Sequence, residues 1–213
     1  MRCDKKDLLL YGVTDRSWLG DRTLAQQVEA SLRGGATMIQ LREKHMDRGS
    51  ILAQALELRE LCGRYGVPLI LNDDAELAQA AGADGVHVGQ SDMEAGRVRA
   101  LLGEDKLIGV SARTVEQALA AQAAGADYLG VGAMFPTGTK QDTRPVSYDT
   151  LEAICAAVDI PVVAIGGIGA GNVAELAGSG IAGVAVVSAL YAQPDVEAAT
   201  RSLRAQVERV VGP

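Results

Sequence analysis

Cysteine, histidine and clustered positive charge are all scarce in this sequence, and each shortage excludes a class of protein. The three cysteines, Cys3, Cys62 and Cys155, are far apart and form no Cys-x-x-Cys pair. This pattern argues against a disulfide framework or a structural zinc site and favours a reducing compartment. There are two histidines, no Gly-x-Ser-x-Gly motif and no cysteine near a histidine, so conventional nucleophilic catalysis is not indicated.

Long apolar runs and blocks of basic residues are also absent. No run approaches the roughly 20 apolar residues that a membrane-spanning helix needs, and the N-terminal segment shows no signal-peptide cleavage pattern. The formal net charge is -7, and an acidic chain without a basic block is a poor candidate for binding nucleic acid or an anionic membrane. We therefore expect a soluble cytoplasmic protein that binds small molecules, with any anionic ligand held by locally gathered cations.

What the chain does have is a regular alternation of short β-branched runs with helical patterns. Its 213 residues are 48% hydrophobic, enough for one full core, and its 25 glycines fall between apolar runs, as turns would. The predicted strands cover residues 8–14, 38–44, 68–72, 85–89, 107–111, 128–133, 161–166 and 183–188. Eight strand–helix pairs predict a single-domain (β/α)8 TIM barrel. The main alternative, an open doubly wound sheet, more usually has about five or six strands.

Polar residues collect at the carboxyl ends of the predicted strands, where a barrel of this class carries its active site. On the second strand Ile39 and Leu41 should face the helices. Gln40, Arg42 and Lys44 alternate with them and should face the barrel mouth. Two cations turned toward a protein interior favour a site for an anionic ligand, although a strand end fraying into solvent is the alternative.

Two carboxylates follow the third and fourth predicted strands. Asp73 comes directly after Asn72, and Asp92 follows the fourth strand by three residues. Neighbouring strands bring these ends together, and Mg²⁺ takes one or two carboxylates plus water and phosphate oxygens. We therefore expect Asp73 and Asp92 to hold Mg²⁺. The alternative is that Asp74 or Asp92 caps the helix that it precedes.

Donors for a second anion follow later strands. Residues 137–140, Thr-Gly-Thr-Lys, place two hydroxyls and an ammonium in one loop, which suits a phosphate but also an ordinary surface loop. Glycines at 166–171 precede a predicted helix after the seventh strand, and Ser188 ends the eighth. This is the usual phosphate position of the fold. Ser111 ends the fifth strand, and His87 is expected to be a satisfied core histidine.

These residues resemble the thiamine phosphate synthase family over nearly the whole chain. The matching segments are 11–15, 40–44, 72–73, 85–92, 109–111, 128–132, 135–142, 165–168 and 183–188. The resemblance implies a transferase that joins hydroxymethylpyrimidine diphosphate to a thiazole phosphate and releases pyrophosphate. It also implies that the diphosphate leaves first and that the thiazole nitrogen captures a pyrimidine carbocation.

The same resemblance implies a role for each candidate residue. The pyrimidine would be held by Gln40 and Asn72, and the diphosphate by Arg42, Lys44, Ser111 and Lys140. Asp73 and Asp92 would hold Mg²⁺, and the thiazole phosphate would be bound by Thr137, Thr139, Gly167, Val187 and Ser188. A homodimer is common among relatives. Two alternatives are the related thiazole tautomerase, an isomerase on the same fold, and a non-catalytic sensor of a phosphate ligand.

Overall fold

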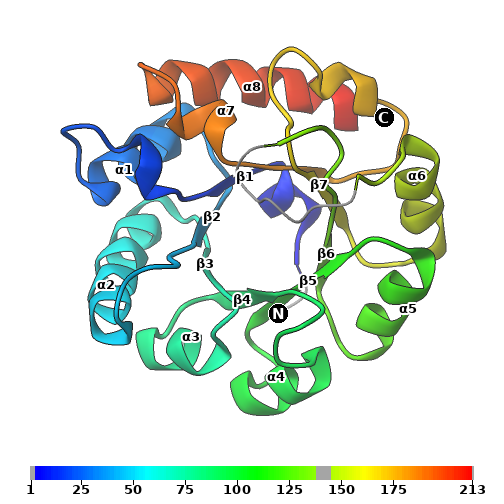
Figure 1. Ribbon diagram of the computed structural model, residues 1–213, viewed down its shortest axis with the longest axis horizontal. Coiled ribbons are helices and arrows are strands. Elements are labelled where there is room, and N and C mark those ends of the chain that lie inside the picture. The colour runs from blue at the N-terminus through cyan, green and yellow to red at the C-terminus, as the bar shows by residue number, and fades with distance from the viewer. Residues whose placement is uncertain (1–2, 138–144, 213) are drawn as a thin grey trace.

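The computed structural model describes residues 3–137 and 145–212, and in this part of the chain eight parallel strands close into a barrel (Figure 1). Each strand pairs with the next along the chain, and β8 pairs with β1. This closure confirms the predicted barrel and excludes an open doubly wound sheet. The strands are β1 Leu10–Val13, β2 Met38–Leu41, β3 Leu69–Asn72, β4 Gly85–Val88, β5 Leu107–Ala112, β6 Tyr128–Val131, β7 Val162–Ile165 and β8 Gly183–Val186.

Helices surround the barrel and alternate with its strands (Figure 1). They are α1 Leu24–Gly34, α2 Arg48–Tyr65, α3 Ala75–Ala81, α4 Ala95–Leu102, α5 Val115–Ala123, α6 Tyr148–Ala157, α7 Ser188–Tyr191 and α8 Val196–Val211, with 3-10 turns η1 Lys5–Leu8, η2 Arg16–Trp18 and η3 Val173–Leu176. The helix predicted after the seventh strand is thus the single 3-10 turn η3, and α7 is an additional short helix. None of the described helices is long and apolar enough to cross a membrane.

Side-chain caps fix where several helices begin. At α1, Thr23 and Gln26 form a reciprocal capping box. At α5 only one of the two hydrogen bonds of a capping box forms: Thr114 Oγ1 accepts from the N–H of Gln117 at 3.2 Å. The Gln117 side chain instead accepts from the N–H of Arg113 at 2.8 Å. Gln117 therefore anchors the backbone of a residue just outside the helix.

Alternation along the strands divides the core into two layers. Ile39 and Leu41 of β2 pack between the barrel and the helices, as predicted. Met38 belongs to the inner layer, and Gln40 is buried and lines a cavity at the end of the barrel. The lower barrel interior is thus filled with apolar side chains, while polar side chains appear toward the carboxyl ends of the strands.

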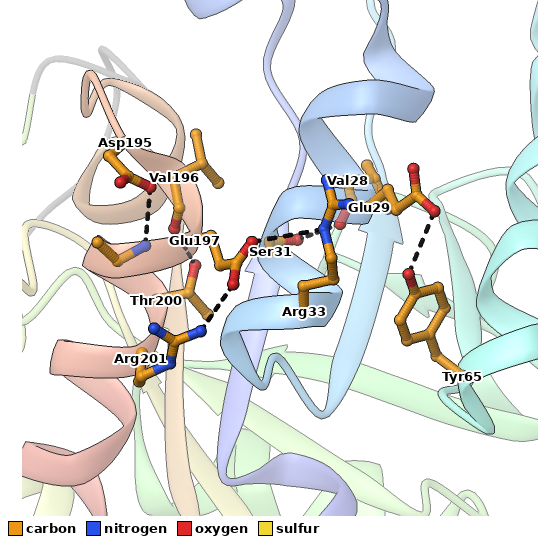
Figure 2. Close-up of polar contacts among 11 residues, drawn as sticks. Val28, Glu29, Ser31, Arg33, Tyr65, Asp195, Val196, Glu197, Thr200 and Arg201 are labelled. Atoms are coloured by element: carbon orange, nitrogen blue, oxygen red, sulfur yellow. Dashed lines mark hydrogen bonds and ion pairs between the residues drawn. The ribbon is translucent and has the colours of Figure 1, made fainter.

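Helix α8 completes the ring of helices by packing against α1 (Figure 2). A Cβ atom added to Gly34 would lie 2.5 Å from Thr200 Cβ and 2.6 Å from the carbonyl oxygen of Glu197. The Glu197 carboxylate pairs with Arg33 of α1 at 3.4 Å and with Arg201 at 2.7 Å. Because these pairs are partly exposed, they contribute little to stability. The close approach of the two helices depends mainly on the missing side chain at Gly34.

We predict that Gly34→Ala lowers the free energy of unfolding by about 1–3 kcal/mol, because the added methyl group collides with α8. The matched control is Gly63→Ala in α2, where an added Cβ meets no atom within 4 Å. The control should keep the parent stability or gain up to about 1 kcal/mol from the higher helix propensity of alanine. Urea denaturation measures both variants, and equal stabilities would contradict the packing argument.

Candidate active site

The carboxyl ends of the strands surround one cavity of about 170 Å³. It draws side chains from β1, β2, β3, β4, β5, β7 and β8 and from the loops that follow them. Eight of the residues predicted to bind substrate line it: Gln40, Arg42, Asn72, Ser111, Thr137, Gly167, Val187 and Ser188. The two anion regions that the sequence indicated therefore belong to one site.

A wider groove of about 710 Å³ continues from this cavity. It shares Thr137, Gly167, Ile168 and Ser188 with the cavity, and its outer wall includes the exposed Trp18. The side of the cavity formed by the loops after β6, β7 and β8 is thus the side through which the cavity and the groove communicate.

A chain of hydrogen bonds crosses the barrel beneath the cavity. Gln40 Nε2 donates to the Tyr11 hydroxyl at 2.7 Å, and the hydroxyls of Tyr11 and Tyr128 lie 3.0 Å apart. His87 Nδ1 lies 3.1 Å from the Tyr128 hydroxyl, and His87 Nε2 lies 3.0 Å from Ser111 Oγ. Both ring nitrogens of His87 are bonded, so the expectation of a satisfied histidine is confirmed. The chain links two predicted substrate contacts, Gln40 and Ser111, through the barrel interior.

Two glycines make room for this chain. A Cβ atom at Gly109 of β5 would overlap the Tyr128 ring and the His87 ring, and a Cβ atom at Gly130 of β6 would lie 3.0 Å from His87 Cε1. Gly130 therefore interrupts the apolar pattern of the sixth strand because a side chain there would crowd the His87 ring. Without side chains at these positions, the imidazole can lie against the neighbouring strands and reach Ser111.

Two guanidinium groups line the cavity, and the sequence analysis identified only one of them. Arg42 follows β2, and its backbone N–H donates to Thr14 Oγ1 at 3.0 Å. Arg113 follows β5 and is half-buried in the cavity wall. The signal for Arg113 was present, because it lies two positions after Ser111, as Arg42 lies two positions after Gln40.

Lys44 does not lie where the alternation predicted. Strand β2 ends at Leu41, and Lys44 is exposed in the following loop and does not line the cavity. The neighbouring Glu43 is the residue whose side chain is buried, and it pairs with Arg16 at 2.7 Å. The strand pairing therefore ends before the alternation reaches residue 44, and the binding of the diphosphate by Lys44 stays a prediction. Thr139 and Lys140 lie outside the described residues.

The two aspartates expected to hold Mg²⁺ follow the neighbouring strands β3 and β4. The N–H of Asp73 donates to the carbonyl oxygen of His87 at 2.8 Å, and Asp92 Oδ2 accepts from the N–H of Gly89 at 2.7 Å. Asp73 also has a φ of 66°, an uncommon backbone conformation that tends to occur at functional positions. The structure thus brings Asp73 and Asp92 to the same part of the rim.

This donor set fits Mg²⁺. Both carboxylates belong to exposed residues, and within residues 3–137 and 145–212 no group of three or more His, Cys, Asp or Glu side chains could hold a metal. Mg²⁺ needs only one or two carboxylates when water and substrate phosphates supply the other ligands. The capping alternative holds for Asp74, which accepts from the N–H of Leu77, but not for Asp92, because Glu94 caps α4.

The glycine-rich turn after β7 is held in place by its neighbours. Gly166 and Gly167 have φ values of 96° and 68°, a backbone conformation that residues with a side chain rarely adopt. Asn172 joins the ends of the turn, because Oδ1 accepts from the N–H of Gly169 and Nδ2 donates to the carbonyl oxygen of Gly167, both at 2.9 Å. The N–H of Phe135 donates to the carbonyl oxygen of Gly166 at 3.0 Å. The loop carrying Thr137 is thereby fastened to the turn.

Comparison with known proteins gives consistent matches. A family model described as thiamine monophosphate synthase matches residues 10–190. The chain is 48% identical to the thiamine-phosphate synthase of Ruminiclostridium cellulolyticum, over 93% of this chain and 95% of the relative. It is 50% identical to that of Chloroflexus aurantiacus, over 94% and 93%. The solved thiamine phosphate pyrophosphorylase from Pyrococcus furiosus has a TM-score of 0.90 and 38% identity, covering 98% of this chain and 99% of that one.

The buried tyrosines predict a loss of stability in alkali. Burial raises the pKa of Tyr11, Tyr128 and Tyr191, so these hydroxyls stay protonated in the folded protein. In the unfolded chain they ionise near pH ~10, so the folded state binds more protons above that pH. Each of these tyrosines should therefore lower the free energy of unfolding above pH ~10 by up to about 1.4 kcal/mol per pH unit, in addition to the contribution of the three cysteines, whose pKa burial also raises.

Denaturant titrations at several pH values measure this slope. Tyr191→Phe removes one of the three hydroxyls and should make the slope above pH ~10 shallower by up to about 1.4 kcal/mol per pH unit. An unchanged slope in that variant would contradict the assignment of the alkaline loss to the buried tyrosines.

Proposed function

The chain belongs to the thiamine monophosphate synthase family, and from this membership we propose that it joins hydroxymethylpyrimidine diphosphate to a thiazole phosphate, giving thiamine phosphate and pyrophosphate. The observation that carries the proposal is the single cavity with two different ends. One end has guanidinium groups near paired carboxylates, and the other has hydroxyls beside a glycine-rich turn. Such a cavity suits two phosphorylated substrates held head to head.

At the first end the diphosphate would lie against Arg42 and Ser111, with Lys44 and Lys140 as further cations. Asp73 and Asp92 would hold Mg²⁺, which supplies charge neutralisation to the diphosphate oxygens when bound. The Arg42 guanidinium makes no ion pair with any residue in the described ranges, so its charge is available to a ligand. Ser111 Oγ is oriented by its contact with His87.

The pyrimidine ring would lie between Gln40 and Asn72, above the buried tyrosines. Because Gln40 Nε2 donates to the Tyr11 hydroxyl, the Gln40 carbonyl oxygen is left to accept from an amino group on the ring. The Tyr11–Tyr128 contact holds that hydroxyl in place. This arrangement gives the amide one orientation and therefore favours a ring with a donor over a ring with an acceptor at that position.

At the second end the thiazole phosphate would be bound by Thr137, Thr139, Gly167, Val187 and Ser188. The turn containing Gly167 is held by Asn172, and Ser188 begins α7 directly after β8. Backbone N–H groups and hydroxyls are suitable donors for a phosphate monoester without adding net positive charge. The two anions are thereby distinguished, since the guanidinium groups lie on the β2 and β5 side of the cavity.

The reaction requires no general base. The bond between the pyrimidine methylene carbon and the diphosphate oxygen breaks, and its electron pair leaves with pyrophosphate. The thiazole nitrogen supplies the electron pair for the new carbon–nitrogen bond, and no proton is transferred. Among the described residues that line the cavity there is no Asp, Glu or Cys, and both nitrogens of His87 are already bonded. Stabilisation of the leaving group would then provide most of the catalysis.

The three cysteines are unpaired, which fits the reducing compartment expected from the sequence. A cytoplasmic location and a homodimeric assembly belong to the same proposal and stay predictions.

The decisive experiment is to measure pyrophosphate release and thiamine phosphate formation by the purified protein with both substrates. We predict activity with Mg²⁺ and loss of activity in EDTA, restored by added Mg²⁺. Asp73→Asn should raise the Mg²⁺ concentration required for half-maximal rate, whereas Asp149→Asn, an exposed carboxylate in α6, should not. Saturable thiazole phosphate binding without pyrophosphate release would instead support the tautomerase or the sensor.

A second prediction concerns the orientation of Gln40. Tyr11→Phe removes the hydroxyl that accepts from Gln40 Nε2 and should raise the KM for the pyrimidine diphosphate about 5- to 10-fold, as expected for one hydrogen bond. The KM for the thiazole phosphate should change less than about 2-fold. Tyr191→Phe is the control, because its buried hydroxyl contacts Ser31 outside the cavity. Equal effects of both variants on the pyrimidine KM would overturn the orientation argument.

A further inference from the structure

Arg113 is a cavity residue to which neither the sequence pattern nor the family resemblance assigned a role. Its backbone is fixed at the start of α5, because its N–H donates to Gln117 Oε1 at 2.8 Å and Thr114 caps the helix next to it. It directly follows Ala112, the last residue of β5, which is paired with Val131 of β6. The side chain therefore starts from a rigid point at the cavity wall, where it is half-buried.

The guanidinium of Arg113 makes no hydrogen bond or ion pair with any residue in the described part of the chain. Elsewhere the protein pairs a comparably buried arginine: Arg99, with 15% of its side chain exposed, contacts Asp127 at 2.6 Å. Arg113 and Arg42 instead line a cavity whose described residues include no carboxylate. Two partly desolvated cations without a counter-ion are costly unless a ligand supplies negative charge.

The position of Arg113 in the barrel indicates which ligand group it meets. Strands β2 and β5, which precede Arg42 and Arg113, flank β3 and β4, which precede Asp73 and Asp92. The two guanidinium groups thus lie on either side of the carboxylate pair. The glycine-rich turn that would hold the thiazole phosphate follows β7, two strands beyond β5.

We propose that Arg113 is a second guanidinium that binds the diphosphate of the pyrimidine substrate, from the side opposite Arg42. This inference rests on the proposed function and adds to it a substrate-binding residue. A guanidinium offers paired N–H donors that match two phosphate oxygens. When the carbon–oxygen bond breaks, the departing diphosphate gains negative charge, so Arg113 stabilises the transition state more than the bound substrate.

The test compares Arg113→Gln, Arg113→Lys and the control Arg97→Gln. Arg97 is exposed on α4, and its replacement changes the net charge by the same amount outside the cavity. Arg113→Gln should lower kcat/KM for the pyrimidine diphosphate by about 10- to 100-fold, with part of the loss in kcat. Arg113→Lys should recover only part of this loss, because it keeps the charge but not the paired donors. The KM for the thiazole phosphate should stay within about 2-fold of the parent value.

A binding measurement separates this inference from the proposed function. Calorimetric titration with inorganic pyrophosphate and Mg²⁺ needs no turnover, and Arg113→Gln should raise the Kd about 10-fold or more, while Arg97→Gln leaves it within about 2-fold. An unchanged Kd in Arg113→Gln, an equal loss in Arg97→Gln, or a selective loss of thiazole phosphate binding would each overturn the role of Arg113. If the parent protein binds pyrophosphate but forms no thiamine phosphate, the proposed reaction is wrong. The Kd of Arg113→Gln for pyrophosphate then still shows whether Arg113 binds the diphosphate. Because the Arg113 side chain has no partner within residues 3–137 and 145–212, its replacement should leave the thermal midpoint unchanged.

Discussion

The pairing of β8 with β1 is the contact on which the rest of the site depends. In an open sheet these two strands would be opposite edges, and the residues after β8 would lie far from those on β2 and β3. Closure brings the Tyr11 hydroxyl, on β1, to 3.0 Å from the Tyr128 hydroxyl across the barrel, although the two residues are 117 positions apart in the chain. It also lets one cavity collect side chains from seven of the eight strands and their loops. The two anion-binding ends that we propose for this site depend on this geometry.

The barrel interior is apolar at one end and hydrogen-bonded at the other, and this division gives the cavity a rigid floor. Gln40, Tyr11, Tyr128, His87 and Ser111 satisfy one another in sequence, so the buried polar groups avoid the cost of an unpaired donor or acceptor. Such a chain holds only if each member keeps its rotamer. The absence of side chains at positions 109 and 130 makes those rotamers possible. Gln40 and Ser111, the proposed substrate contacts at the two ends of the chain, are therefore held by the three side chains between them.

The charge of the cavity wall is opposite in sign to the net charge of the protein. The protein carries a formal net charge of -7, yet the cavity wall holds two arginines and, within the described residues, no carboxylate. Asp73 and Asp92 lie at the ends of β3 and β4 between these arginines, at exposed positions. A metal-bound diphosphate would thus meet guanidinium groups on both sides and carboxylates only through the metal.

The sequence by itself determined the eight-fold alternation, the outward apolar face of β2, the cap formed by Asp74 and the family to which the motifs belong. These features depend on residues a few positions apart, whose hydrogen bonds and hydrophobic periodicity are local. Where each strand stops was decided by its pairing with neighbours. Strand β2 ends at Leu41 and leaves Lys44 outside the cavity, whereas β5 continues to Ala112 and delivers Arg113 into it. Only the tertiary structure could show which of these two cations starts at the cavity wall, because the length of a strand is set by the strands that pair with it.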